Sequence, residues 1–188
     1  RYIPIVFEGN APADLPDNNL LRDALATLPS TPPVAPRCWI GAPNSIKGPT
    51  EAVFHRQSGN HLLIVGQRED AATTMLGVSM IALAAQFPIG AARFILLHSS
   101  APGTPDSDFF DRIAGIIPHG VTISRGHDLA NVMAELSEEL KTRNARAAEG
   151  TQDPAAAPST FVFIHGLQRF KKLRAEDDFS FSMGDGDG

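Results

Sequence analysis

Apolar runs alternate with amphipathic stretches along the chain from Arg37 onward. HLLIV at 61–65 is a continuous apolar run, of the kind that a strand buried on both faces of a sheet needs. Three further short strands are predicted at RFILL (93–97), VTIS (121–124) and TFVFI (160–164). Short apolar pieces, CWIGA and AVFHR, lie before the first of these four strands, around a polar turn.

Three helices are predicted between these strands. The first runs from Ala71 to about Phe87, and Asp70 can cap its start. The second is DFFDRIAGII, which Pro118 stops, and the third opens at Asp128. The third is long and amphipathic, because its apolar residues recur at helical spacing. These residues are Leu129, Val132, Met133, Leu136 and Leu140.

Strands that alternate with helices predict an α/β fold with a parallel sheet and right-handed crossovers. In such sheets the working residues lie at the carboxyl ends of the strands. The corresponding positions are 66–70, 98–100, 125–127 and 165–169. His98 and His165 would share one cleft if their strands were neighbours.

Residues 1–36 differ from the rest and are predicted to form an N-terminal arm or a junction with an upstream domain. They hold a short strand in RYIPIVFEGN, a short helix in NNLLRDALATL and a stiff proline-rich linker at 30–36. Residues 37–188 would form one domain, with a mobile small-residue linker near 147–159. After Phe170 the chain turns polar, so the domain is expected to be incomplete at its C-terminal side.

Composition narrows the function classes. The 188 residues suffice for one domain with a sizeable core, and no apolar run reaches the roughly 18 residues of a membrane span. Cys38 is the only cysteine, which leaves no disulfide framework and fits a cytoplasmic setting, although a longer parent chain could be membrane-associated. The net charge of −5 argues against free-standing non-specific nucleic-acid binding but leaves open DNA contact through a local patch.

HLLIVGQREDAATT has the layout of a phosphate-binding loop, in which a strand is followed by a glycine, a polar stretch and a helix. The complete motif reads G-x-x-x-x-G-K-[ST]. Gly66 takes the place of its first glycine, and Thr73 takes that of the hydroxyl that holds magnesium. Ala71 and Ala72 replace the second glycine and the lysine. The simpler alternative is an ordinary strand-to-helix turn capped by Asp70.

The missing lysine sets the expected affinity for nucleotide. A charged hydrogen bond to phosphate is worth about 1.5–3 kcal/mol, so its loss weakens binding roughly ten- to a hundredfold. Glu69 and Asp70 add negative charge, and two like charges about 4 Å apart repel by about 4 kcal/mol at an effective dielectric of 20. We therefore expect ATP and magnesium to bind weakly if at all, and no other cofactor or metal. The remaining nucleotide-binding positions are Gly66, Gln67, Arg68, Thr73 and Thr74.

The fourth predicted strand ends without the acids that an ATPase of this class requires there. An aspartate at this point holds magnesium, and an acidic neighbour orients the attacking water. Here His165 and Gly166 fill both positions, and magnesium prefers oxygen ligands. No residue is therefore predicted to be catalytic, and His165 is most simply a strand-end histidine in a polar cleft. A hydrolase triad of Ser99, His165 and Asp106 or Asp128 is disfavoured, because the sequence has no G-x-S-x-G elbow.

A basic cluster follows the fourth strand and is a candidate contact patch for DNA phosphates or an acidic partner. Its members are Arg169, Lys171, Lys172 and Arg174. The alternative is a solvated basic loop, whose field the acids from Glu176 onward would offset.

Two stretches of the chain resemble the FtsK/SpoIIIE group of motor ATPases. They are WIGAPNSIKGPTEAVFHRQSGNHLLIVGQ, with the helix after it, and PSTFVFIHGLQRFKKLR. More closely, they are similar to the degenerate ATPase modules found in tandem in that group, including the EccC-type ATPases of secretion systems. SIKGPTEAVF and its spacing of roughly a hundred residues from TFVFIHGLQRF carry most of the resemblance, which covers about 37–188.

The resemblance implies a RecA-like fold, a three-layer parallel sheet of the P-loop NTPase type, that assembles into rings. Intact members hydrolyse ATP to translocate DNA or recognise export substrates. By position, Gly66 and Thr73 match the Walker A motif, whereas Ala71, Ala72 and the His165–Gly166 pair depart from Walker A and Walker B. The resemblance thus implies a non-hydrolysing scaffold or partner-binding module of a larger ATP-driven translocase. Its partners would be other domains of the parent chain, ring subunits, DNA or an exported protein. The alternative is a functional ATP-binding DNA translocase domain with non-standard site residues.

Overall fold

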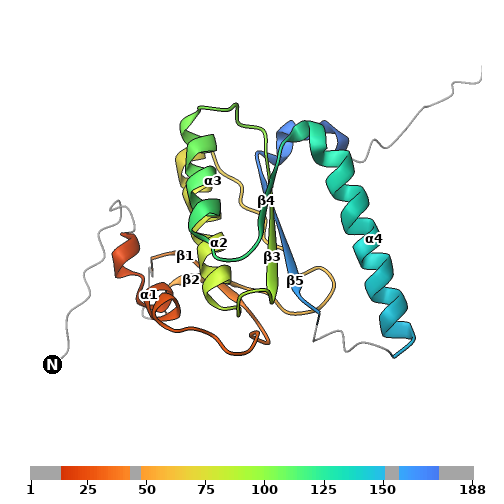
Figure 1. The fold of residues 1–188 in the computed structure, drawn as a ribbon. Helices are drawn as coiled ribbons and strands as arrows, with labels where there is room; N and C mark the ends of the chain where they lie inside the picture. The colour runs from red at the N-terminus through yellow and green to blue at the C-terminus, as the bar shows by residue number, and fades with distance from the viewer. Residues whose placement is uncertain (1–13, 43–47, 151–156, 174–188) are drawn as a thin grey trace, which may run out of the picture.

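The computed structural model describes residues 14–42, 48–150 and 157–173 (Figure 1). The strand predicted in RYIPIVFEGN lies outside these residues, as do Arg174 and part of the linker near 147–159. The helices are α1 Asn19–Ala26, α2 Glu69–Ala85, α3 Pro105–Ile116 and α4 Leu129–Ala148. The strands are β1 Arg37–Gly41, β2 Thr50–Val53, β3 Ala92–His98, β4 Val121–Ser124 and β5 Ser159–His165.

The prediction of an α/β fold is confirmed: a three-stranded parallel sheet is flanked by helices on both faces. Its strand order is β4-β3-β5, so the chain moves from β3 to one side and then crosses to the other. Right-handed crossovers in opposite directions place their helices on opposite faces of the sheet. Figure 1 accordingly shows α3 and α4 on opposite sides, with α2 beside α3.

The core lies on both faces of β3, the central strand of this sheet. Phe94 and Leu96 point toward α2 and α3, where they pack with Met80 and Phe110. Ile95 and Leu97 point to the opposite face of the sheet, where they form a second cluster with residues in the first turns of α4. Successive side chains of a strand alternate between faces, so a continuous apolar run such as RFILL fills both layers.

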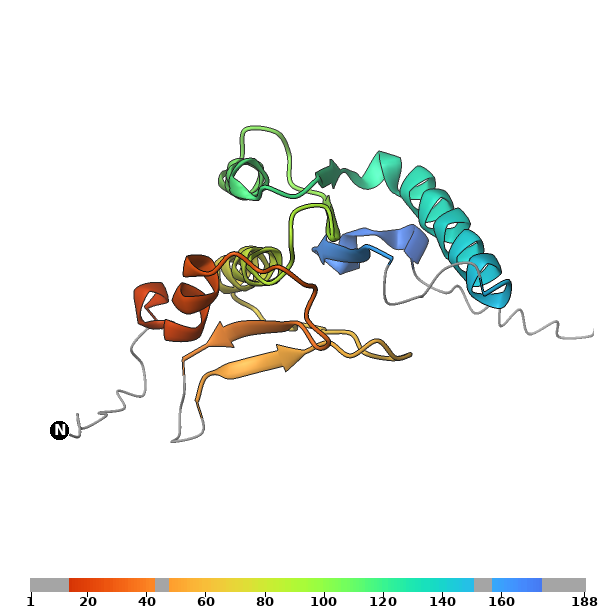
Figure 2. The ribbon, with the colours of Figure 1, turned by 60° about the horizontal axis from the view of Figure 1, so that its bottom comes forward.

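The long helix α4 covers only part of the sheet. Leu129 and Val132 are buried, and Met133 and Leu136 pack against the same cluster, as the predicted apolar stripe requires. Leu140 is 59% exposed, however, and departs from the predicted stripe. The helix leans away from the sheet toward its C-terminal end (Figure 2). Its later turns contact the sheet through polar groups, with Glu139 accepting from Arg93 and Arg143 donating to the carbonyl oxygen of Pro158.

A two-stranded antiparallel hairpin of β1 and β2 packs against α2 outside the parallel sheet (Figure 2). It corresponds to the two short apolar pieces of the sequence. Beside it, α1 buries Leu21 against Val78 and Ala82 of α2, together with Trp39. Part of the predicted N-terminal arm is thus packed on α2.

The strand predicted at 61–65 is wrong. Residues 61–66 are irregular and belong to neither sheet of the described structure, and Leu63 and Val65 are 71% and 85% exposed. A strand needs a neighbouring edge to satisfy its backbone hydrogen bonds, whatever its apolar content. In the described structure β5 pairs with β3 and not with this run, and the two segments both line a cavity of about 1260 Å³.

Candidate functional site

The carboxyl ends of β3 and β5 bring two buried histidines side by side. His98 and His165 are register partners on these neighbouring parallel strands, so the condition that the sequence left open, that their strands be neighbours, is met. Both are almost fully buried, at 0% and 5% exposure. Their ring centroids lie 5.5 and 5.2 Å from that of Phe110, which comes from α3. The pair therefore faces α3.

Thr73 connects the start of α2 to this pair. Its Oγ1 lies 3.1 Å from Nε2 of His165 and donates a hydrogen bond of 3.4 Å to Oδ1 of Asp106. Thr73 is 5% exposed, and Asp106 lies in the first turn of α3. Three elements distant in sequence thus meet at one polar point. Helix α3 begins near the carboxyl end of β3, which it follows, and α2 packs beside α3 and β5.

The loop that resembles a phosphate-binding loop is short. Helix α2 begins at Glu69, three residues after Gly66, and not at Ala71 as predicted. Its N-cap is Arg68, so Asp70 lies within the first turn and does not cap the helix. Arg68 Nη2 instead donates to Asp70 Oδ2 at 2.6 Å, and both side chains are exposed. This hydrogen bond is the main cause that lowers the pKa of Asp70 and raises that of Arg68.

The predicted nucleotide-binding residues therefore separate into two groups. Gly66 and Gln67 line the large cavity, together with Ala72 in the place of the lysine. Thr73 points to His165, whereas Thr74 is exposed and donates to the carbonyl oxygen of Asp70 within its own helix. Of the predicted nucleotide-binding residues, Gly66 and Gln67 thus line the cavity, whereas Arg68, Thr73 and Thr74 do not.

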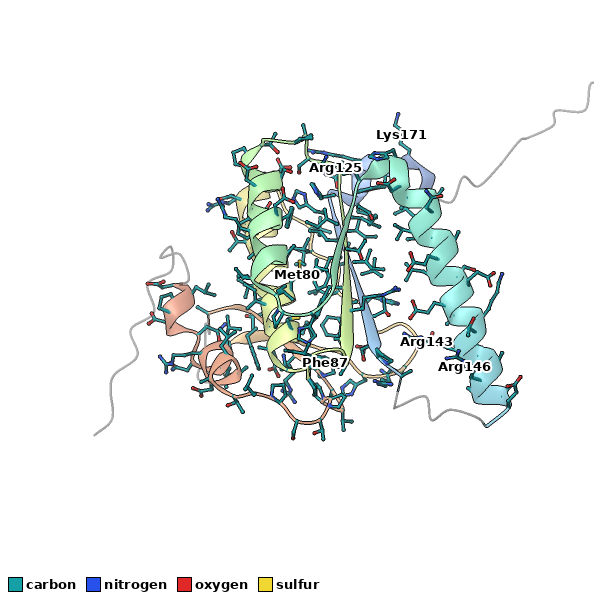
Figure 3. All side chains as sticks on the ribbon, in the orientation of Figure 1. Met80, Phe87, Arg125, Arg143, Arg146 and Lys171 are labelled. Atoms are coloured by element: carbon teal, nitrogen blue, oxygen red, sulfur yellow. The ribbon has the colours of Figure 1, made fainter. Side chains whose placement is uncertain are left out.

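The predicted basic patch is also divided. Arg169 follows β5 and lines the cavity, and its Nη2 donates to Oε1 of Glu69 at 3.1 Å. Lys171 is exposed, whereas the side chain of Lys172 and all of Arg174 lie outside the described part of the chain. Figure 3 shows Arg125 and Lys171 at the same end of the molecule, with Arg143 and Arg146 near the opposite end of α4.

Glu69 and Asp106 are site residues that sequence reasoning did not assign to a joint role. One ligand atom from each of Glu69, Asp106 and His165 lies within 4.8 Å of the other two. From the sequence, Glu69 is expected to repel phosphate, but in the structure it is paired with Arg169. Glu69 lies in the first turn of α2 and Asp106 in the first turn of α3. An acid at the start of each of these helices is the signal from which sequence reasoning could have found the pair.

Several buried polar atoms near this point have no hydrogen-bond partner among the described residues. They are both ring nitrogens of His98, Nδ1 of His165 and the hydroxyls of Ser99, Ser100 and Ser107. Each unsatisfied buried polar group costs about 1–3 kcal/mol, and proteins seldom retain many in one place without a reason. This concentration marks the carboxyl edge of the sheet as the candidate functional site.

Comparisons with models of protein families, with curated proteins and with solved structures found no match. The class of this protein is therefore described from its fold and site alone. It is an α/β protein with a parallel sheet flanked by helices and a polar site at the carboxyl edge of that sheet. None of the helices in the described residues is long and apolar enough to cross a membrane.

Replacing Thr73 by valine removes the hydroxyl shared by His165 and Asp106 while keeping the side-chain shape. We expect Thr73→Val to lower the free energy of unfolding by about 1–3 kcal/mol, because two partly buried groups lose their partner. The matched control is Thr74→Val, whose side chain is exposed; it should change stability by less than about 0.5 kcal/mol. Urea unfolding of both variants measures the difference, and equal losses would contradict the role given to Thr73.

His98 should make stability depend on pH. Burial lowers the pKa of His98, and the charge of Arg125 lowers it further. Below about pH 6.5 the unfolded chain therefore binds more protons than the folded chain at this residue, so stability falls as the pH falls. Thermal unfolding between pH 7.5 and 5 should show a smaller loss in His98→Gln than in the native protein. An identical loss in both proteins would exclude His98 as the source.

Proposed function

We propose that this chain is a RecA-like module of the FtsK/SpoIIIE type with a degenerate nucleotide site, serving as a non-hydrolysing scaffold or partner-binding part of a larger ATP-driven translocase. One observation carries the proposal. Thr73, at the position of the Walker A hydroxyl, lies 3.1 Å from Nε2 of His165, at the position of the Walker B acid. In an intact site these two positions flank magnesium, whereas here they contact each other.

The loop supports the same proposal. Ala72 offers only a methyl group to the cavity where the motif has a lysine. Arg68, the nearest cation in the loop, is hydrogen-bonded to Asp70 and exposed. Since a charged hydrogen bond to phosphate is worth about 1.5–3 kcal/mol, the loop lacks the contact that usually dominates nucleotide affinity.

The proposed partners follow from the role of a scaffold. They are other domains of a parent chain, neighbouring ring subunits, DNA or an exported protein. Arg169 and Lys171 follow β5 and would be the described members of a basic contact patch. The pairing of Arg169 with Glu69 reduces the positive field that this patch would offer to DNA.

A working ATP-binding translocase domain with non-standard residues is the second candidate. The cavity of about 1260 Å³ favours it, because it exceeds the range of about 300–1,000 Å³ of ordinary small-molecule sites and so has room for a nucleotide. Arg56, Arg143 and Arg169 line this cavity and are the cations that could approach a phosphate there. The two candidates differ in whether nucleotide binds with a dependence on magnesium.

Calorimetry with ATP, with and without magnesium, separates the two candidates. We expect no binding by the native chain at millimolar ATP. The double variant Ala71→Gly with Ala72→Lys should bind ATP, because it restores the phosphate contact. Its matched control carries Ala71→Gly with Ala72→Gln, which keeps a long polar side chain without the charge. The lysine variant should bind roughly ten- to a hundredfold more tightly than this control.

Two results would contradict the proposal. Micromolar, magnesium-dependent binding by the native chain would favour the working translocase. Equal behaviour of the lysine and glutamine variants would remove the basis for a nucleotide site at this loop.

A further inference from the structure

Glu69, Asp106 and His165 present three metal-binding side chains at one point. Their ligand atoms all lie within 4.8 Å of one another, although the residues come from the first turn of α2, the first turn of α3 and the end of β5. Their burial is graded: His165 is buried, Asp106 is half-buried and Glu69 is exposed. The cluster therefore reaches from the interior of the protein to its surface.

Thr73 adds a fourth donor at the spacing of a coordination shell. Its Oγ1 is 3.1 Å from Nε2 of His165 and 3.4 Å from Oδ1 of Asp106. First-row metal ions bind nitrogen and oxygen at about 2.0–2.2 Å, which sets adjacent ligand atoms roughly 3.0–3.4 Å apart in tetrahedral or octahedral geometry. The two distances match this range.

The acids alone would not identify a site, because carboxylates in the first turn of a helix are stabilising without any ion. The second observation is the histidine beside them. His98 is fully buried, neither of its ring nitrogens has a partner among the described residues, and it is the register partner of His165. The ring centroids of His98 and His165 lie 5.5 and 5.2 Å from that of the same Phe110 ring, which places His98 beside the cluster.

The unpartnered serines extend this argument. Ser99 and Ser100 follow His98, Ser107 follows Asp106, and all three hydroxyls are buried without a partner in the described structure. Proteins seldom retain buried polar groups without a partner. The three hydroxyls thus leave hydrogen-bonding capacity that a ligand or an ordered water at this site would satisfy.

We propose that Glu69, Asp106, His165 and Thr73 form a binding site for a divalent transition metal ion, with Zn²⁺ as the ion of best fit. An imidazole with carboxylates suits zinc and its first-row neighbours, whereas magnesium and calcium favour oxygen ligands alone. The proposal of a metal site does not depend on the proposal that the chain is a RecA-like module. It replaces the prediction from sequence that the chain binds no metal.

The site would also remain accessible. Glu69 and His165 line the large cavity, so one side of the ion would face open space. Arg169 now pairs with Glu69 and would have to release this carboxylate, which lowers the expected affinity for the ion. An open coordination position is what separates a metal site that can bind a further ligand from a closed structural site.

Metal titration of the chain tests the proposal, with Zn²⁺ by calorimetry and Co²⁺ by visible absorption. We expect one equivalent of Zn²⁺ to bind, and Co²⁺ to show ligand-field bands. Asp106→Asn and Glu69→Gln should each weaken binding at least tenfold. Millimolar Mg²⁺ should not displace Zn²⁺. Because Glu69 is exposed, its variant remains folded and keeps the test valid even where a buried substitution does not fold.

Two matched controls separate this site from surface binding. Asp108→Asn changes another acid in the first turn of α3 that is outside the cluster. His127→Gln changes an exposed histidine whose Nε2 lies 3.1 Å from Asp128. Both variants should bind Zn²⁺ like the native chain. The proposal fails if Zn²⁺ does not bind, if Glu69→Gln and Asp106→Asn bind it unchanged, or if His127→Gln abolishes binding.

Discussion

Burial of β3 on both faces is the constraint on which the rest of the structure depends. Phe94 and Leu96 pack against α2 and α3, while Ile95 and Leu97 pack against α4, so this strand can only be central. Its two edges hold β4 and β5 in parallel register. The position of this strand between two helical layers therefore determines the edge of the sheet. It sets which carboxyl ends of strands and which first turns of helices lie together there.

The candidate site is a consequence of that arrangement. His98 and His165 are adjacent only because β3 and β5 are, and Thr73 and Asp106 reach them because α2 and α3 cover the same face. The site combines a buried histidine pair with hydroxyl and carboxylate groups from helix starts. Buried polar groups without partners lower stability, so their concentration here is an arrangement that packing alone would disfavour.

The sequence predicted most of this architecture, because hydrophobic periodicity reports which faces are buried. Three strands and the helices between them follow from it. The meeting of His98 with His165 does not, because it depends on β3 and β5 being neighbours in the sheet. The run at 61–65 shows its limit: apolar residues indicate that burial is favourable, but a strand also needs an edge to pair with, which periodicity does not report. The joint role of Glu69 and Asp106 was likewise hidden, since it depends on the order of strands in the sheet.

The central claim is that a loop resembling a phosphate-binding motif lacks its supporting strand. Amide hydrogen exchange tests this most directly, because amides in a strand ladder are protected and unpaired amides are not. The account predicts slow exchange at Ile95 and Leu97 within β3, and fast exchange at Leu63 and Val65. Protection of Leu63 and Val65 equal to that of β3 would contradict the account, since it would show that the run at 61–65 is a paired strand.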